Sequence, residues 1–281
     1  MTAIATAPAV DPSFRFLQDI AKDLATRDIS FPTFSQATMH IRNVLDDPNV
    51  NADKIARVVT KEPLLAAKLV KLANTAALNP SGRAVSDVRT AVIRVGHSNV
   101  RSVAAAVAYE QLRGDKDMRP FRTQAESAWK HTVQVAALSH VIASKMTRLS
   151  ADEALFAGLV HDIGYYYLLS RAGRYAELHG QPEALGAILR EWHASIGQTV
   201  LHSFGLTQAV LDAVGEHESG TYNMPPEKIS DVVALANLVA SASNPVNDPS
   251  MPPIVLDEPE LMAVIGEGSE HVNSLAAVLQ G

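Results

Sequence analysis

A histidine and an aspartate stand next to each other inside a strongly apolar stretch of the sequence. The stretch Ala157–Gly164 reads AGLVHDIG, and the His161–Asp162 pair follows an apolar run that begins at Glu153. Neutral imidazole and carboxylate are ordinary ligands for a first-row metal ion, and the same two groups can instead form buried hydrogen bonds. Successive helix residues point about 100° apart, so the pair can share one ion only if other helices supply further ligands. The spacing of the pair alone is therefore a weak indication of a metal site.

The segments that could supply such ligands all have helical periodicity. In the second half we predict a long helix from Thr123 to Lys145, a helix from Pro182 to Phe204, a helix that ends at Glu216–Glu218, and one from about Ile229 to Ala242. Almost no segment alternates with a period of two residues, which is the pattern of a half-buried strand. We therefore predict an all-α protein.

The first half is also predicted to be helical, with polar side chains at the helix ends. Asn51 and either Ser86 or Asp87 are suitable N-caps, and a helix from about Ala37 to Leu45 precedes them. The run Leu64–Asn74 is apolar around most of its circumference, as expected in the middle of a helical domain. Asn74 either recognises a ligand or, as we favour, bonds backbone groups where this helix is interrupted.

The charged run from Arg113 to Asp117, followed by Pro120, is typical of a domain junction. The predicted order is a mobile leader, two helical subdomains, and a Pro-rich loop with a terminal helix. These segments are residues 1–13, 14–117, 118–243 and 244–281, respectively.

Composition limits the classes of partner. Of the residues, 47% are apolar and 19% are charged, which is typical of a globular protein, and the net charge is −6. A nucleic-acid binder normally has a basic surface, and the absence of a Lys/Arg cluster argues against duplex DNA or RNA as a partner. With no cysteine, disulfides and thiolate metal sites are excluded. The segment Met1–Pro8 does not resemble a signal peptide and no run of about 18 apolar residues occurs, so we predict a cytoplasmic protein without a membrane span.

Motifs in both halves resemble one bacterial signalling family. The first half contains Asp46–Pro48, Glu62–Thr75 and Ser86–Gly96, and the second contains the His161–Asp162 pair between His131 and Asn237. Over roughly residues 25 to 240 the chain resembles the HDOD domain, the HD-related output domain of bacterial signalling proteins. HD enzymes are metal-dependent phosphohydrolases whose ligands follow the order His, His-Asp, Asp on separate helices. The resemblance implies that residues 118–243 form an HD-like helical bundle.

The resemblance also implies a set of metal ligands. One divalent iron, manganese or zinc ion would be held by His131, His161, Asp162 and Asn237. His193 and His217 stand where the HD-GYP phosphodiesterase branch has histidines for a second metal. In the alternative interpretation these side chains form a hydrogen-bonded polar cluster. His193 would then be partly buried beside Trp192, and His217 would end a helix, where the dipole favours its charged form.

This chain differs from HD and HD-GYP enzymes at positions that matter for metal binding and hydrolysis. The last ligand position holds Asn237 rather than an aspartate, and an amide oxygen is a poor ligand that removes one negative charge from the site. Tyr165 replaces the lysine usual in HD-GYP enzymes, and their Gly-Tyr-Pro triplet has no counterpart near Gly220–Tyr222. Of Tyr165, Tyr166 and Tyr167 we expect one or two to be in the core, because three consecutive residues cannot share one helix face.

The resemblance therefore implies a non-catalytic signal-transduction module that acts through a signalling protein partner or a nucleotide second messenger. A weak metal-dependent phosphohydrolase and a purely structural scaffold are the alternatives, and the oligomeric state is left open.

Overall fold

The structure, a computed structural model, describes residues 11–26, 41, 43–45, 47, 49–76, 78–80, 82–203, 206–247 and 257–280. Within these ranges the regular structure consists of helices and no strand occurs, which confirms the all-α prediction. The helices are α1 (Pro12–Ala25), α3 (Ala52–Val59), α4 (Pro63–Ala73), α5 (Val88–Val95), α6 (His97–Arg113), the 3₁₀ helix η1 (Lys116–Phe121), α7 (Arg122–Met146), α8 (Ala151–Val160), α9 (Ile163–Ala172), α10 (Ala176–His179), α11 (Pro182–Ser203), α12 (Gln208–Glu216), α13 (Ile229–Val239), the 3₁₀ helix η2 (Ser241–Ser243), α14 (Pro259–Glu267) and α15 (Ser269–Gln280).

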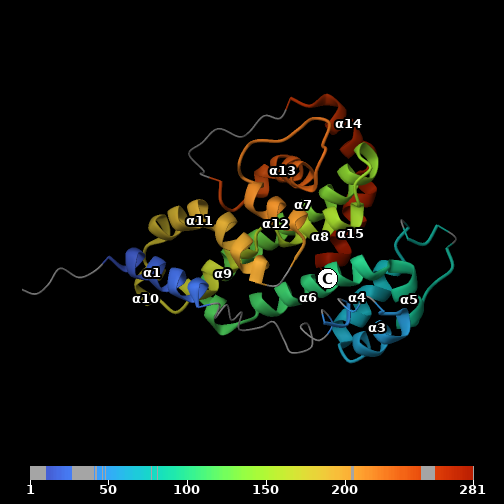
Figure 1. Ribbon diagram of the computed structural model, residues 1–281, viewed down its shortest axis with the longest axis horizontal. Helices are drawn as coiled ribbons and strands as arrows, with labels where there is room; N and C mark the ends of the chain where they lie inside the picture. Colours follow the sequence, from blue (N-terminus) through green and yellow to red (C-terminus); the bar gives the residue numbers. More distant parts are fainter. Residues whose placement is uncertain are drawn as a thin grey trace, which may run out of the picture.

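The long helix α7 is the centre of the molecule. It packs most extensively against α8, and α13, α14 and α15 also contact it (Figure 1). Buried residues occur along its whole length, from Ala125 to Ala143, so apolar and polar side chains alike are enclosed by neighbouring helices. A polar group on the inner face of α7 must therefore find its partner within the protein.

The helices of the first half lie to one side of α7. Helices α3, α4 and α5 contact one another, and α6 runs from them to α8 and α7 (Figure 1). Side-chain caps begin two of these helices as predicted: Asn51 accepts from the N–H of Lys54, and Asp87 accepts from the N–H of Thr90. Each cap satisfies a backbone donor that the first helical turn leaves unpaired.

The C-terminal helix α15 joins the two halves, because it contacts α7, α4 and α6. The ammonium group of Lys68 on α4 donates to the carbonyl oxygen of Leu279 at 3.2 Å, and Lys71 donates to that of Ala277 at 3.1 Å. Both lysines thus bind carbonyl groups at the C-terminal end of α15, where the helix leaves acceptors unpaired and its dipole favours a cation.

Several other sequence predictions can be compared with this fold. Asn74 ends α4, donates to the carbonyls of Val70 and Val85, and accepts from the N–H of Val85, which confirms its structural role. The predicted terminal helix is two helices, α14 and α15, that meet at Gly268. Helix α1 begins at Pro12, within the predicted leader, and residues 1–10 lie outside the described part. Parts of the predicted helix 37–45 and of the predicted loop 244–259 also lie outside the described residues. Among the described residues, no helix is long and apolar enough to span a membrane.

Candidate metal centre

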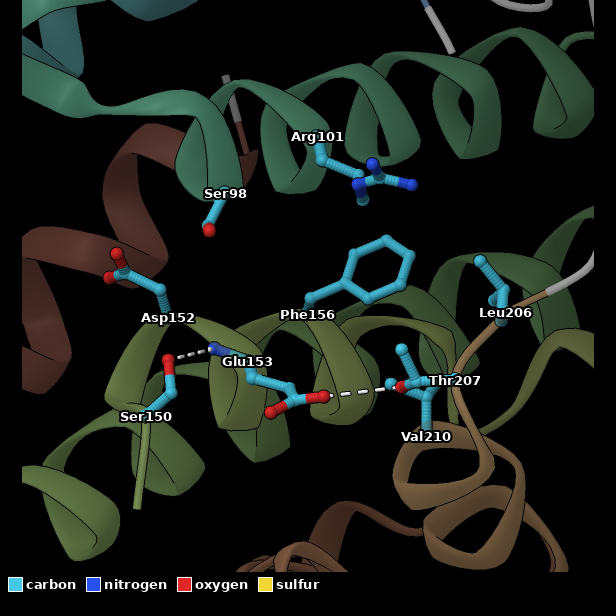
Figure 2. Close-up of a pocket in the computed structure, with 9 residues that line it drawn as sticks. All are labelled: Ser98, Arg101, Ser150, Asp152, Glu153, Phe156, Leu206, Thr207 and Val210. Carbon is cyan, nitrogen blue, oxygen red and sulfur yellow. Dashed lines mark hydrogen bonds between the residues drawn. The ribbon is translucent and has the colours of Figure 1, made fainter. Parts of the chain in front are cut away.

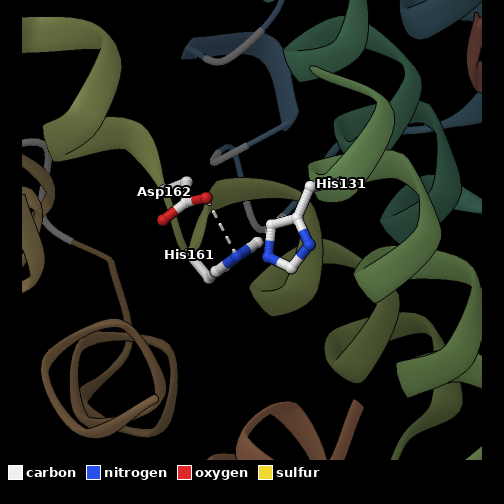
Figure 3. Close-up of side chains that lie close together, drawn as sticks. All are labelled: His131, His161 and Asp162. Atoms are coloured by element: carbon white, nitrogen blue, oxygen red, sulfur yellow. Dashed lines mark ion pairs between the residues drawn. The ribbon is translucent and has the colours of Figure 1, made fainter. Parts of the chain in front are cut away.

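Side chains from helices that are far apart in the sequence meet at one buried point. His131 lies in the middle of α7, His161 and Asp162 occupy the turn between α8 and α9, and Figure 3 shows these three side chains close together. The other members are His193 of α11, His217 at the end of α12, and Asn237 of α13. Their exposed fractions lie between 0% for His131 and 3% for Asn237. The six positions singled out in the sequence are therefore all brought together.

Two glycines let the helices approach closely enough to form this cluster. A Cβ added to Gly158 of α8 would lie 2.8 Å from the Cα of Ala136 on α7. A Cβ added to Gly164 of α9 would lie 1.9 Å from the carbonyl oxygen of His193 on α11. Contacts this short leave no room for a side chain. The glycines thus set the distance of α7 and α11 from the His161–Asp162 turn.

Three of the histidines are oriented in the same way. The Nδ1 atoms of His161, His193 and His217 each lie 2.7 Å from a backbone carbonyl oxygen, those of Gly158, Leu189 and Val214, respectively. A carbonyl can only accept, so each Nδ1 carries the hydrogen, and in the neutral ring Nε2 is an acceptor. This anchoring through one ring nitrogen is typical of metal-binding histidines, because it fixes the tautomer and the ring orientation.

The acceptor atoms then face one another. The Nε2 atoms of His193 and His217 are 3.1 Å apart, and each lies near Asp162 Oδ1, at 3.7 and 3.5 Å. His161 Nε2 lies 3.3 Å from Asp162 Oδ2. This nitrogen and both carboxylate oxygens of Asp162 are buried and have no hydrogen-bond partner. Lone pairs at such distances repel unless a proton or a metal ion lies between them. The arrangement can therefore accommodate a proton or a metal ion between these atoms.

The orientation of Asn237 follows from its neighbours. Its Nδ2 donates to Glu218 Oε1 at 3.1 Å and to the carbonyl oxygen of His217 at 3.3 Å, and both of these groups can only accept. Its Oδ1 is thereby turned toward His131, whose Nε2 lies 2.9 Å away. Nε2 of His131 must donate this hydrogen bond, so His131 has the opposite tautomer from the other three histidines. Its Nδ1 lies 3.3 Å from the hydroxyl of Ser243.

The buried charges shift the pKa values of the cluster. Burial lowers the pKa of His131 to about 4, and burial together with neighbouring His217 lowers that of His193. For His217, burial favours the neutral ring, but the contact with Asp162 outweighs it and raises the pKa. Burial would raise the pKa of Asp162, yet the surrounding histidines, His161 first, hold it well below the usual range. The centre thus favours an ionised carboxylate on Asp162, the neutral ring of His131 and His193, and the charged ring of His217.

Some expectations about individual residues need correction. His193 is buried rather than partly buried, although Trp192 beside it is exposed. Tyr165, Tyr166 and Tyr167 are all in the core, not one or two of them, because α9 is enclosed on several sides by η1, α10 and α11. His217 does end a helix, as predicted.

Three further polar residues belong to the surroundings of the centre and were not anticipated as members. They are Glu218, Ser243 and Asn244. The Nδ2 of Asn244 donates to Glu218 Oε1 at 2.8 Å, and Ser243 Oγ lies 3.3 Å from His131 Nδ1. Glu218 follows His217 directly in the sequence, and this adjacency is the feature that could have indicated that Glu218 lies beside the centre. Ser243 and Asn244 lie at the end of the 3₁₀ turn after α13, for which the sequence has no periodic pattern.

Comparison with known families identifies the architecture. The model of the HDOD domain matches residues 31–219, which is more than half of the chain. The chain belongs to the HDOD domain family. His131, His161, Asp162, His193 and His217 lie within the matched residues, and Asn237 lies beyond them.

Solved structures share the fold of this HDOD protein. A provisionally named metal-dependent phosphohydrolase of Shewanella amazonensis SB2B aligns over 95% of this chain and 99% of its own, with a TM-score of 0.73 and 21% identity. An HDOD domain protein of unknown function from Geobacter sulfurreducens aligns over 96% and 98%, with a TM-score of 0.59 and 18% identity. A provisionally named signal transduction protein of Marinobacter aquaeolei VT8 aligns over 98% and 68%, with a TM-score of 0.58 and 18% identity. These neighbours show an HD-like fold.

Relatives found by sequence are longer proteins. An uncharacterized protein of Treponema pallidum (strain Nichols) is 24% identical over 239 residues, which are 78% of this chain and 44% of that protein. Ribonuclease Y of Chlorobaculum tepidum is 30% identical over 123 residues, which are 44% of this chain and 19% of that protein. The HDOD chain therefore spans less than half the length of these relatives.

The donor set of this HDOD protein fits a divalent metal ion. Two groups of ligand atoms lie within 4.8 Å of one another, His131 with His161 and Asp162, and Asp162 with His193 and His217. Imidazole nitrogen and carboxylate oxygen are suitable ligands for iron, manganese or zinc. The unsatisfied atoms of Asp162 and His161 are the structural observation that supports this fit.

A separate pocket lies at the opposite ends of two helices that lead to the centre. It has a volume of about 350 Å³ and lies between α6 and the beginnings of α8 and α12 (Figure 2). The ring of Phe156 points into it toward α6, from which Arg101 extends (Figure 2). The hydroxyl of Thr207 donates a hydrogen bond to Glu153 Oε1 along the opposite side (Figure 2). The complete lining is Ser98, Arg101, Ser150, Asp152, Glu153, Phe156, Leu206, Thr207 and Val210. Its volume is within the range of small-molecule sites.

Proposed function

We propose that this HDOD protein is a non-catalytic signal-transduction module whose HD-like centre stabilises the fold and whose pocket and surface receive the signal. In this proposal the chain has two helical subdomains, residues 14–117 and 118–243, and the second is an HD-like bundle. A signalling protein is the expected partner, and a nucleotide second messenger is the expected small ligand.

The observation that supports this proposal is the state of the last ligand position. Asn237 is hydrogen-bonded through its Oδ1 to His131 and through its Nδ2 to Glu218, so it serves the polar network. A hydrolase needs a metal-bound water and access for a phosphate ester to that water. The side chains of the centre are almost completely buried, which is unfavourable for such access.

The pocket supports the choice of a nucleotide as ligand. The guanidinium of Arg101 suits a phosphate, and the ring of Phe156 suits stacking by a base. The carboxylates of Asp152 and Glu153 can accept hydrogen bonds from base N–H groups. The pocket contains residues of α6 on one side and of α8 and α12 on the other, so a ligand there would contact both proposed subdomains.

Helices α8 and α12 also give a route from this pocket to the centre. Glu153 is in the first turn of α8, and His161 follows the last residue of the same helix. Thr207 precedes α12, and His217 follows it. With a rise of 1.5 Å per residue, each helix spans roughly 15 Å. A rigid shift of either helix on ligand binding would therefore move a residue of the centre, which is the kind of physical connection that coupling requires.

Weak metal-dependent phosphohydrolysis is the second candidate function. It is favoured by the two groups of ligand atoms that share Asp162, since a shared carboxylate is suited to bridge two ions. The test compares the wild type with the Asn237→Asp variant. Hydrolysis of a generic phosphodiester and of cyclic dinucleotides is measured for each protein with added manganese. We expect no turnover above the metal-only background in either protein. Turnover that increases in Asn237→Asp and disappears in His161→Ala would establish the enzyme and refute the proposal.

Ligand binding is tested separately with a panel of mono- and cyclic nucleotides, followed by thermal unfolding and calorimetry. We expect at least one nucleotide to raise the unfolding temperature of the wild type, because a ligand that binds only the folded state stabilises it. The gain should be lost in Phe156→Ala and Arg101→Gln. Arg122→Gln, at an exposed position at the start of α7, is the matched charge control. No binding by any nucleotide would leave a protein partner as the input and would exclude the nucleotide part of the proposal.

A further inference from the structure

The two groups of ligand atoms in the centre are not equivalent, and the difference originates at Asn237. Because the Nδ2 of Asn237 faces two groups that can only accept, its Oδ1 must face His131. His131 Nε2 therefore donates its hydrogen to Asn237 Oδ1 at 2.9 Å, and the Nδ1 of His131 lies 3.3 Å from Ser243 Oγ. Nε2 carries the hydrogen and has no lone pair to offer a metal ion, and Nδ1 faces the hydroxyl of Ser243.

A metal ion on the His131 side would need this network to be broken. His131 would have to change tautomer and release Asn237, whose buried oxygen would then keep only the long contact with Asn244 Nδ2, at 3.4 Å. An unsatisfied buried acceptor costs about 1–3 kcal/mol. An aspartate at position 237 would not impose this cost, because a carboxylate offers only acceptors and can itself bind the ion.

The other group has its donors already in place. His193 and His217 donate their Nδ1 hydrogens to the carbonyl oxygens of Leu189 and Val214, which leaves both Nε2 lone pairs directed inward. Asp162 Oδ1 completes the triangle, and the other oxygen of this carboxylate faces His161. All three side chains are buried and held by helices of the same bundle. No rotation or change of tautomer is required before an ion can bind.

The dimensions of this triangle suit a metal ion. Its edges are 3.1 Å between the two Nε2 atoms, and 3.7 and 3.5 Å from these atoms to Asp162 Oδ1. Metal–ligand bonds of 2.0–2.2 Å in a tetrahedral site place neighbouring ligand atoms about 3.3–3.6 Å apart. One of the three edges lies within this range and the other two lie within about 0.2 Å of it, so small shifts would place the three atoms at the corners of one face of such a site. Two imidazoles with one carboxylate suit iron, manganese or zinc.

We propose that the chain holds a single divalent metal ion on Asp162, His193 and His217, and that Asn237 removes His131 from the ligand set. The substitution at position 237 therefore moves the metal to the other side of Asp162 rather than only weakening a site for two ions. This inference does not depend on the signalling role, since it concerns which side chains bind the ion.

The test is metal stoichiometry, measured on full-length protein purified without a chelator or a histidine tag. The metal is then removed, and manganese, iron(II) or zinc is added back separately and measured by elemental analysis after gel filtration. We expect about one ion per chain in the wild type. His131→Ala should still bind one ion. His193→Ala and His217→Ala should bind more than about 100-fold more weakly, because even indirect partners of a metal ligand change affinity 10–100-fold.

Unfolding must be separated from loss of a ligand. Circular dichroism and the unfolding temperature of each metal-free variant are recorded, and His193→Gln and His217→Gln replace any alanine variant that fails to fold. The readout is then the increase in unfolding temperature on adding metal, expected in the wild type and His131→Ala but absent in the His193 and His217 variants.

Three results would overturn the inference. They are loss of metal in His131→Ala to the same extent as in His193→Ala, two ions per chain in the wild type, and no binding of any of the three metals by the folded wild type. Turnover of a phosphodiester by the wild type would refute the proposed function, but it would leave this comparison of variants intact. The two proposals can therefore fail separately.

Discussion

Gly164 and His193 are in direct backbone contact where α9 crosses α11. The approach is so close that a Cβ on Gly164 would lie 1.9 Å from the carbonyl oxygen of His193 and 2.5 Å from the amide nitrogen of Gly197. The imidazole of His193 extends from this crossing to Asp162, only two residues before Gly164. The geometry of the centre therefore depends on a glycine that carries no ligand atom itself.

Replacing Gly164 by alanine should separate α9 from α11. The added methyl group meets backbone atoms, which cannot rotate away, so we expect a loss of about 3 kcal/mol or more in the free energy of unfolding. The metal-induced increase in unfolding temperature should also fall, because His193 moves away from Asp162. Urea unfolding with and without manganese measures both effects.

Gly266→Ala is the matched control, since a Cβ at this position in α14 has no atom within 4 Å. Alanine has a higher helix propensity than glycine, by about 1 kcal/mol, so this variant should be as stable as the wild type or more stable. Equal stability of Gly164→Ala and the wild type would contradict the role given to the close crossing.

The Asn237→Asp variant should behave differently with and without metal. Without metal, the new carboxylate loses the two hydrogen bonds that Nδ2 donates and lies beside Glu218, whose Oε1 is 3.1 Å from the present amide nitrogen. We expect the metal-free variant to be about 1–3 kcal/mol less stable than the wild type. With metal, the carboxylate and His131 become available as ligands, so the variant should bind a second ion per chain and gain more stability from metal than the wild type does.

The matched control is Asn244→Asp, which also brings a carboxylate next to Glu218 but lies outside the two groups of metal ligands. It should lose stability without gaining a second ion. Binding of one ion by Asn237→Asp, as in the wild type, would contradict the role of Asn237 in excluding His131.

The sequence predicts the helices of this centre well but not their local hydrogen bonds. The predicted helix 123–145 corresponds to α7 (Arg122–Met146), and the predicted helix 182–204 corresponds to α11 (Pro182–Ser203). Hydrophobic periodicity and caps decide such boundaries locally. The order of His and Asp residues along the chain resembles HD enzymes, and this resemblance identified all six members of the buried cluster.

Other features depend on tertiary contacts that a single sequence does not reveal. The direction of the Asn237 amide is decided by Glu218 and the carbonyl of His217, which the chain brings together only in the fold. The burial of three consecutive tyrosines arises because α9 has neighbours on several sides, whereas a helix at the surface would bury one face. Tyr166, for example, contacts Tyr109 of α6, with ring centroids 4.8 Å apart.

Lys68 should control how firmly α15 is held. Its buried ammonium group donates to the carbonyl oxygen of Leu279 and lies 3.5 Å from Glu110 Oε2. Lys68→Met keeps most of the buried volume but leaves both acceptors without this donor, so we expect a loss of about 1–3 kcal/mol. Amide hydrogen exchange should increase selectively in α15.

Lys71→Met is the comparison, because Lys71 donates to Ala277 from an exposed position. Exposed contacts of a lysine contribute less than about 1 kcal/mol, so exchange in α15 should change little. Equal exchange rates in the two variants would show that burial of Lys68 does not hold the helix.

The carboxylate of Asp231 should make stability depend on pH. It is buried at the start of α13, where it accepts hydrogen bonds from the backbone N–H groups of Asn223, Glu227 and Lys228. Burial alone would raise its pKa, but these donors outweigh burial and lower the pKa below 3.8. Because the folded-state pKa is below the unfolded value of about 3.9, the stabilisation is complete above pH 5 and is lost as the pH falls through the folded-state pKa.

Asp231→Asn should therefore be less stable than the wild type by about 2 kcal/mol at pH 7, since hydrogen bonds to a charged group contribute about 1.5–3 kcal/mol. The difference should persist at pH 5 and shrink below about pH 4, where the unfolded chain begins to bind a proton at Asp231 while the folded protein still resists protonation. Urea unfolding at pH 7, 5 and 3.5 measures it, with Asp257→Asn, at an exposed position, as the control. If the difference were the same at pH 3.5 and pH 7, the effect of the substitution would come from packing of the amide, and the ionised carboxylate would not be what holds residues 223–228 on α13.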